Sequence, residues 1–175
     1  PYKTLADLLA AAKAGKAITA ASAGNGTSQH MAMELFKFKL GAKGLTHIPY
    51  KGSGPAIQDA LGGQVDILFD TTVAAQQHID GGRLRPLAVT SAKRLATLPG
   101  VPTVAEGGVP GFEVVSWQAI FVPAKTPAAV VARLNTEIGK ILASAEMQER
   151  LAKLGMLNQP MTSEQVQTFQ KAEIA

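Results

Sequence analysis

Short strand-like runs alternate with helix-like stripes over the first ninety residues. Gly-rich or polar turns of a few residues separate them. Such alternation predicts an α/β fold, in which helices flank a mostly parallel sheet. The predicted strands are residues 18–21, 46–50, 65–69 and 84–90.

The helical stripes between these strands have apolar residues three or four positions apart, as an amphipathic helix requires. Thr4 is a candidate N-cap for the first helix, and Asp70, Thr71 and Thr72 are candidates for the fourth, which is expected to reach Ile79. The predicted inward-facing residues of the first three helices are Leu5, Leu8, Leu9 and Ala12, then Met31, Leu35 and Phe38, then Ile57, Ala60 and Leu61.

The pattern changes after residue 91. Residues 92–112 are rich in Pro and Gly, which predicts a long ordered loop with one helical turn near Val104 to Glu106. Residues 113–122 read as a strand that contains the single tryptophan, Trp117. From there on the chain is predicted to be helical. The three helices are marked by apolar stripes over 130–142 and 147–154 and by a cap at Thr162 or Ser163.

Composition excludes several classes of protein. Hydrophobic residues make up 46% of the 175 residues and charged residues 17%, which is typical of a globular chain. The net charge is +4, but the basic residues are scattered, so we predict no nucleic-acid partner. The chain has no cysteine, which rules out disulfides and thiolate chemistry. No apolar run approaches the roughly 18 residues of a membrane span.

Ligands of open α/β sheets bind outside the carboxyl ends of the strands. Residues 22–28, 51–55 and 70–72 are the strand-to-helix loops at that edge. Helix N-termini carry unpaired N–H groups and a partial positive charge, which suit an anion. The sequence therefore predicts an anion-binding site at these loops.

The first loop is the strongest candidate. Its glycines allow close backbone approach and positive φ angles, and its hydroxyl and amide side chains can donate hydrogen bonds. The same residue types also make an ordinary capped turn, so both interpretations stay open. The loop matches neither a P-loop nor a dinucleotide-binding motif. Its residues are Ser22, Ala23, Gly24, Asn25, Gly26, Thr27 and Ser28.

Three further residues are candidates for ligand contact. Asp70 directly follows a strand, where it would either cap the next helix or accept a hydrogen bond from a ligand or bound water. Tyr50 and Lys51 end another strand, and Lys51 would either attract a carboxylate or lie on a solvated surface. Trp117 would lie in the core, at a lobe boundary or beside a ligand.

No catalytic or metal-binding motif is present. His30, His47 and His78 lack the spacings of metal sites, and there is no G-x-S-x-G nucleophile elbow. We therefore predict a binding protein without catalytic residues, metal or cofactor.

Several ordered blocks resemble the substrate-binding proteins of tripartite tricarboxylate transporters, also called the Bug family of extracytoplasmic solute receptors. The resemblance depends on the order and spacing of these blocks and covers essentially the whole chain. The blocks are residues 22–28 with His30, His47–Gly52, Gly62–Asp66, Phe69–Asp70, Leu87–Ser91, Leu98–Glu106 and Val109–Glu113.

This resemblance implies a periplasmic receptor of the type II-like Venus flytrap kind, which holds a small carboxylate between two α/β lobes. Di- and tricarboxylates, amino acids and aromatic acids are all candidate ligands, and the membrane components of the transporter would be partners. The family's ligand loop in the second lobe would be Ser22 to Ser28, and its acidic position Asp70.

The family's N-terminal block, with a Pro-Gly-Gly loop, has no counterpart in these residues, and neither does the end of its C-terminal region. We therefore expect residues 1–118 to form the second lobe and residues 119–175 to supply a crossover strand and helices to an otherwise missing first lobe. The apolar stripe over 130–142 would then lack its sheet, and we expect this fragment to self-associate or to fold those helices back.

Two other functions stay open. A small α/β enzyme would need a nucleophile–base pair or a metal cluster. The effector-binding domain of a transcription regulator would share the architecture, but would need a helix-turn-helix segment elsewhere.

Overall fold

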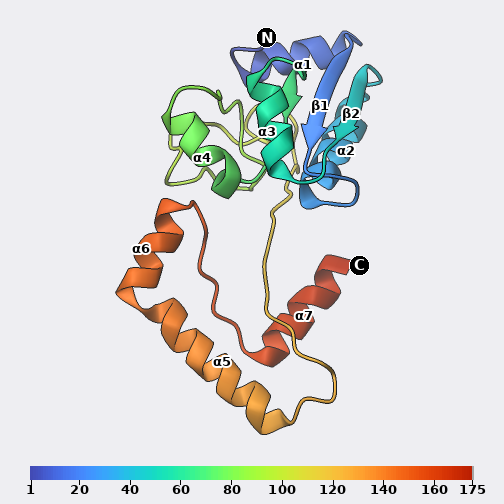
Figure 1. The fold of residues 1–175 in the computed structure, drawn as a ribbon. Helices are drawn as coiled ribbons and strands as arrows, with labels where there is room; N and C mark the ends of the chain where they lie inside the picture. Colours follow the sequence, from blue (N-terminus) through green and yellow to red (C-terminus); the bar gives the residue numbers. More distant parts are fainter. Residues whose placement is uncertain (175) are drawn as a thin grey trace. The chain divides into compact units, whose positions relative to one another are not determined.

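A parallel sheet of three strands lies at the centre of the N-terminal part of the chain (Figure 1), in a computed structural model that describes residues 1–174. The strands are β1 (Ile18–Ser22), β2 (Leu45–Pro49) and β3 (Ile67–Leu68), in the order β2-β1-β3. Ala20 pairs with His47 on one side and Ile67 on the other. The predicted α/β class with a parallel sheet is confirmed.

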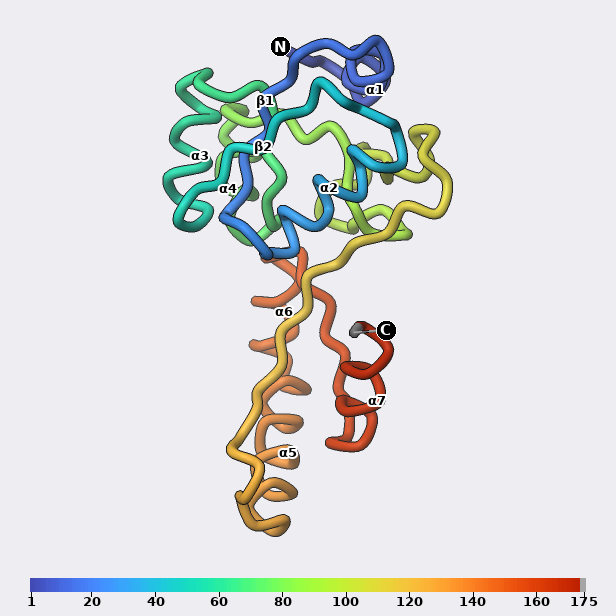
Figure 2. Tube along the Cα trace, turned by 90° about the vertical axis from the view of Figure 1, so that its right-hand side faces the viewer, coloured from blue at the N-terminus to red at the C-terminus, as the bar shows by residue number. Residues whose placement is uncertain are grey.

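Four helices accompany this sheet: α1 (Leu5–Lys13), α2 (Ser28–Leu40), α3 (Ser53–Leu61) and α4 (Thr72–Asp80). As Figure 2 shows, α1 and α2 lie on one side of the strands, and α3 and α4 lie on the other. The ends of the helices follow the sequence signals. Thr4 caps α1, with its side chain accepting from the N–H of Asp7, and Gly41 ends α2 with φ 59°.

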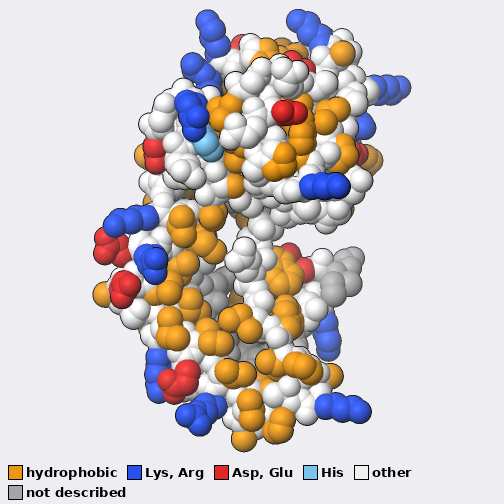
Figure 3. All heavy atoms as spheres, viewed as in Figure 1, with side chains coloured by type: hydrophobic (Ala, Val, Ile, Leu, Met, Phe, Trp, Pro, Cys, Tyr) orange, Lys and Arg blue, Asp and Glu red, His pale blue; other side chains and the backbone are white. Residues whose placement is uncertain are grey.

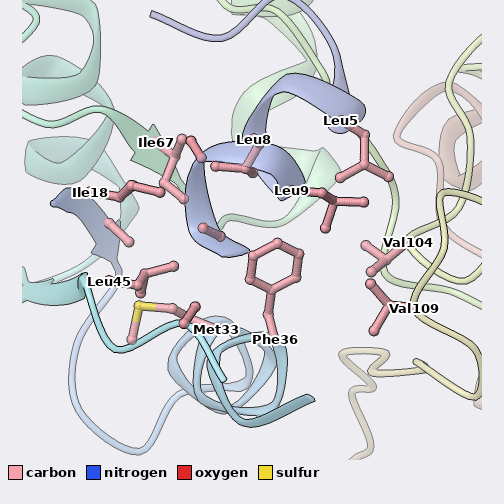
Figure 4. Close-up of a cluster of buried hydrophobic side chains, with 14 of the residues drawn as sticks. Leu5, Leu8, Leu9, Ile18, Met33, Phe36, Leu45, Ile67, Val104 and Val109 are labelled. Atoms are coloured by element: carbon pink, nitrogen blue, oxygen red, sulfur yellow. The ribbon is translucent and has the colours of Figure 1, made fainter. Parts of the chain in front are cut away.

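The larger apolar cluster lies between the sheet and the α1–α2 side. Phe36 of α2 projects into it towards Leu8 and Leu9 of α1 (Figure 4). Its ring meets those of Phe69 and Phe112 edge to face, with centroids 5.8 Å and 6.3 Å away. A smaller cluster on the opposite side of the sheet consists of Ala21, Ala56 and Val65 with Ile48, Tyr50, Ala60 and Leu68 packed against it. Both faces of β1 are therefore buried.

The inner face of α2 differs from the predicted one. Met31 and Phe38 are 57% and 84% exposed, whereas Ala32, Met33 and Phe36 are buried. The helix carries apolar residues on several sides, so more than one face fits the helical period. The buried face is the one that brings Phe36 to Leu9.

The predicted strand over residues 84–90 is not formed. Only Val89 makes a bridge, to Thr103, and its N–H donates to the carbonyl of Pro102. Pro86 has no N–H to donate to a ladder. The loop over 92–112 is ordered as predicted, since Glu106 accepts hydrogen bonds from the N–H of Thr103 and from Arg94.

The predicted strand over residues 113–122 is also wrong. The N–H of Val114 donates to the carbonyl of Thr90, but the backbone beyond it pairs with no strand of the described chain. A strand needs a neighbour to satisfy its backbone groups. Ile120 and Phe121 are 73% and 57% exposed.

The chain divides into two compact units, Pro1–Ser116 and Trp117–Ala175. The second unit contains α5 (Ala128–Ala143), α6 (Ala145–Lys153) and α7 (Ser163–Ile174). Within it, Trp117 packs edge to face on Phe169 and donates to Glu173. No side chain between residues 117 and 173 is buried, and Figure 3 shows many hydrophobic side chains on the face of this unit turned to the viewer. Among residues 1–174 no helix is long and apolar enough to cross a bilayer.

Candidate functional site

Three helices of the first unit begin where the three parallel strands end. α2 follows β1 through residues 23–27, α3 follows β2 through residues 50–52, and α4 follows β3 through residues 69–71. Because parallel strands end at the same edge of a sheet, the starts of these helices share one edge.

The loop after β1 is held in an extended turn that needs glycine. Gly24 has φ 134° and Gly26 has φ 77°, values that other residues rarely adopt. A Cβ at Gly24 would lie 2.9 Å from the carbonyl oxygen of Tyr50, so a side chain cannot fit there without a shift. Thr27 caps α2 by accepting from the N–H of His30 at 3.3 Å, and its hydroxyl donates to the carbonyl of Gly24 at 2.8 Å.

Backbone N–H groups at the helix starts are left without protein acceptors. In the described chain, neither Ser28 nor Gln29 at the start of α2 donates its N–H to another residue, and the same holds for Ser53 and Gly54 at the start of α3. These groups add a partial positive charge at the strand ends. The capped turn and the anion-binding loop are thus compatible, because Thr27 satisfies the third N–H of α2 and leaves the first two free.

Asp70 joins the three helix starts. Its Oδ1 accepts from the hydroxyl of Ser53 at 2.6 Å, from the N–H of Thr71 at 2.8 Å and from the side chain of Gln29 at 3.3 Å. Its Oδ2 is buried and has no hydrogen-bond partner among the described residues. The N-cap of α4 is Thr71, so Asp70 is not the capping residue. A buried carboxylate oxygen without a donor is costly and calls for a donor from a ligand or water.

The remaining candidate residues from the sequence have other contacts or are exposed. The Oγ of Ser22 is buried beneath the loop, where it lies 2.7 Å from Nε2 of His47. The hydroxyl of Tyr50 donates to Asp59 at 2.6 Å, which raises the pKa of the phenol. Lys51 is exposed and forms no ion pair with a described residue, and Asn25 is exposed at the tip of the loop.

The sequence matches the family model described as the tripartite tricarboxylate transporter family receptor over residues 1–175. The chain belongs to this family. The chain is also similar to a protein from Pseudomonas sp. strain P51, the UPF0065 protein in the tcbD-tcbE intergenic region. The two are 44% identical over 158 residues, which are 89% of this chain and 46% of the relative.

Several solved structures, among them that of the periplasmic binding protein BugD, have the same fold. Rpa4515 of R. palustris, solved with adipate, is 35% identical with a TM-score of 0.93, and BugD is 37% identical with a TM-score of 0.89. MatC from Rhodopseudomonas palustris, solved with malate, is 29% identical with a TM-score of 0.87. This chain is covered to 99% in each case, and it spans 58% of Rpa4515, 59% of BugD and 60% of MatC.

Several contacts of the candidate site were not expected from the sequence. Asp70 is contacted by Ser53, which lies in the predicted loop over 51–55, and by Gln29, and both are polar residues in the first turn of a helix. His30 and His47, which the sequence placed in the family blocks but not at the site, stack with ring centroids 4.2 Å apart beside the loop. Within residues 1–174, no three His, Asp or Glu side chains come close enough to hold a metal ion.

Proposed function

We propose that this chain is part of a periplasmic receptor that captures a small dicarboxylate for a tripartite tricarboxylate transporter. The observation that carries the proposal is the group of free N–H donors at the starts of α2 and α3, around the unpartnered Oδ2 of Asp70. N–H donors at helix starts favour a carboxylate. Family membership and the dicarboxylates named with Rpa4515 and MatC support the same ligand class.

Residues 22–28, with Asp70, form the ligand loop in this proposal. Ser28 and Gln29 donate their N–H groups to a ligand carboxylate, and Oδ2 of Asp70 accepts from a ligand hydroxyl, ammonium group or bound water. Tyr50 contributes through its backbone, because its carbonyl lies against Gly24 and its hydroxyl is engaged by Asp59. Lys51 adds positive charge at the rim.

In this proposal, residues 1–118 are the second lobe of the receptor and residues 119–175 supply helices to the first lobe. The protein holds its ligand without transforming it, and needs no metal or cofactor. An enzyme or the effector domain of a regulator is disfavoured, because the family to which the chain belongs is one of receptors.

The test is a titration of the 175-residue chain with adipate and malate, followed by the amide resonances of the loop. We expect saturable shifts at Gly24, Gly26 and Ser28 in the millimolar range, since contacts from the first lobe are absent from the assay. Hexanediol, which lacks the carboxylates of adipate, serves as the uncharged control ligand and should cause none.

Two substitutions test the residues. Thr27→Ala removes the cap that shapes the loop, and Asp70→Ala removes the acceptor Oδ2, so each should weaken binding about tenfold to a hundredfold. Thr27→Ser retains the hydroxyl and Asp80→Ala lies at the far end of α4, so both controls should bind as the parent does. Unchanged affinity in both test variants would contradict the site.

We also propose that the chain associates with itself through its second unit. Val130, Leu134 and Ile141 of α5 are 46%, 41% and 55% exposed, an unusual density of bare apolar side chains along one helix.

A further inference from the structure

Two histidines pack ring against ring beside the ligand loop. His30 lies in the first turn of α2, and His47 lies in the middle of β2, the neighbour of β1. Their ring centroids are 4.2 Å apart and the ring planes differ by 12°. Neither histidine is needed to cap α2, because Thr27 does so.

Each ring holds a different part of the loop. The N–H of Gly26 donates to Nδ1 of His30 at 3.0 Å, so this nitrogen carries no proton. Nε2 of His47 lies 2.7 Å from the hydroxyl oxygen of Ser22, and that same oxygen accepts from the N–H of Gly24 at 3.2 Å. The pair thus connects to the loop at its beginning and at its tip.

We propose that His30 and His47 are positioning residues of the ligand loop. The neutral rings hold the loop in the conformation that binds the ligand, and protonation of the pair releases it. The inference depends on the proposed function, because it takes residues 22–28 as the ligand loop. A proton on Nδ1 of His30 would turn the acceptor for Gly26 into a donor, and the hydrogen bond would be lost.

The surroundings of His47 disfavour its charged form, whereas Nε2 of His30 lies 3.9 Å from the carboxylate of Glu34. Burial, and after it the neighbouring His30, lowers the pKa of His47. Glu34 opposes this shift and Lys37 adds to it, and both belong to α2. β1 and residues 23–27 bring no charged side chain to the rings.

The direction of the pH effect follows from this lowered pKa. The unfolded chain takes up protons at the ordinary histidine pKa of about 6.5, and the folded chain binds them at His47 only at lower pH. The stability that His47 contributes is therefore complete above about pH 6.5 and is lost as the pH falls below that value.

Substitutions that keep a hydrogen-bonding atom in place of one ring nitrogen distinguish a role in positioning the loop from a role in packing alone. The side-chain oxygen of His30→Asn can stand where Nδ1 stands, as an acceptor that does not titrate, whereas His30→Leu fills the space without an acceptor. His47→Gln copies Nε2 towards Ser22 in the same way. His78→Gln is the control, since His78 contacts Arg83 and lies at the other end of α4.

The experiment follows the Gly26 amide resonance and the affinity for adipate from pH 8 to pH 5.5. We expect the parent chain to lose about fivefold to tenfold in affinity while the Gly26 resonance moves. His30→Asn should keep the affinity seen at pH 8 and lose most of the pH dependence. His30→Leu should bind weakly at both pH values, and His78→Gln should behave as the parent does. Titration of adipate itself is common to all variants and cancels.

Measurement on the ligand-free chain distinguishes failure of this inference from failure of the proposed function. If adipate does not bind but the Gly26 resonance titrates in the parent and not in His30→Asn, the proposed function fails and the positioning role holds. If His30→Leu binds as tightly as the parent, or His30→Asn titrates as the parent does, the positioning role is overturned.

Discussion

The two units of the chain bury their apolar side chains to very different degrees. In the first unit both faces of the sheet are covered, and Phe36, Ile18 and Met33 are at most 1% exposed. In the second unit α5 and α6 contain no buried residue, although α5 has a regular apolar stripe. Both units have well-formed helices, so regular secondary structure alone does not indicate a core.

The difference shows what each unit depends on. The first unit has a sheet against which its helices pack, and the free energy of burial comes from within the unit. The helices of the second unit are joined by a few polar contacts, such as that from Asn135 to the carbonyl of Met161, and by the packing of Trp117 on Phe169. We infer that the first unit supplies most of the stability of this chain.

Truncating one large apolar side chain in each unit should produce the largest contrast. Phe36→Ala should destabilise the chain by about 3–5 kcal/mol, because it leaves a cavity among well-packed rings. Leu134→Ala should cost no more than about 0.5 kcal/mol, since the residue is 41% exposed. Urea unfolding measures both, and Phe36→Leu serves if the alanine variant does not fold. Equal costs would contradict the inferred difference.

Replacing a glycine by alanine should change stability less, and in opposite directions in the two units. A Cβ at Gly44 would lie 2.2 Å from the carbonyl oxygen of Lys16, so Gly44→Ala should destabilise the first unit by about 1–3 kcal/mol through backbone displacement. Gly139 lies inside α5, and beyond the adjacent backbone of the helix itself no atom lies within 4 Å of the added carbon. Gly139→Ala should therefore stabilise that helix by about 1 kcal/mol. Circular dichroism during thermal unfolding records both, and a destabilising Gly139→Ala would show that α5 packs more closely than described.

Sequence periodicity predicted the elements whose pattern is local. The helices of the first unit were expected from their apolar stripes and caps, and the strands β1 to β3 from apolar runs bounded by turns. The two wrong strands, at 84–90 and 113–122, have strand-like composition as well. What separates them from β1 is a partner in the sheet, and pairing is a property of the whole fold that a local window does not contain.

The candidate site likewise has features that the local sequence predicts and contacts that it does not. The glycines and the cap of the loop over 22–28 were predictable, because a helix start is a local feature. The contacts of Ser53 and Gln29 with Asp70 were not, because they depend on the strand order β2-β1-β3, which brings three loops together. The stacking of His30 on His47 likewise depends on β2 lying beside β1.

Self-association tests whether the exposed apolar side chains of the second unit form an interface between copies of the chain. If the exposed stripe of α5 drives it, Ile141→Lys should weaken association about tenfold, equivalent to about 1.4 kcal/mol, because a charge replaces an apolar side chain in the contact. Phe38→Lys is the matched control in the first unit, since Phe38 is 84% exposed and belongs to α2 and not to that stripe. Sedimentation equilibrium over a range of concentrations gives the association constants. The role of α5 would be contradicted if the parent chain stayed monomeric at every concentration. It would also be contradicted if Phe38→Lys weakened association more than Ile141→Lys does, because the exposed apolar side chains of α5 would then not form the interface between copies of the chain.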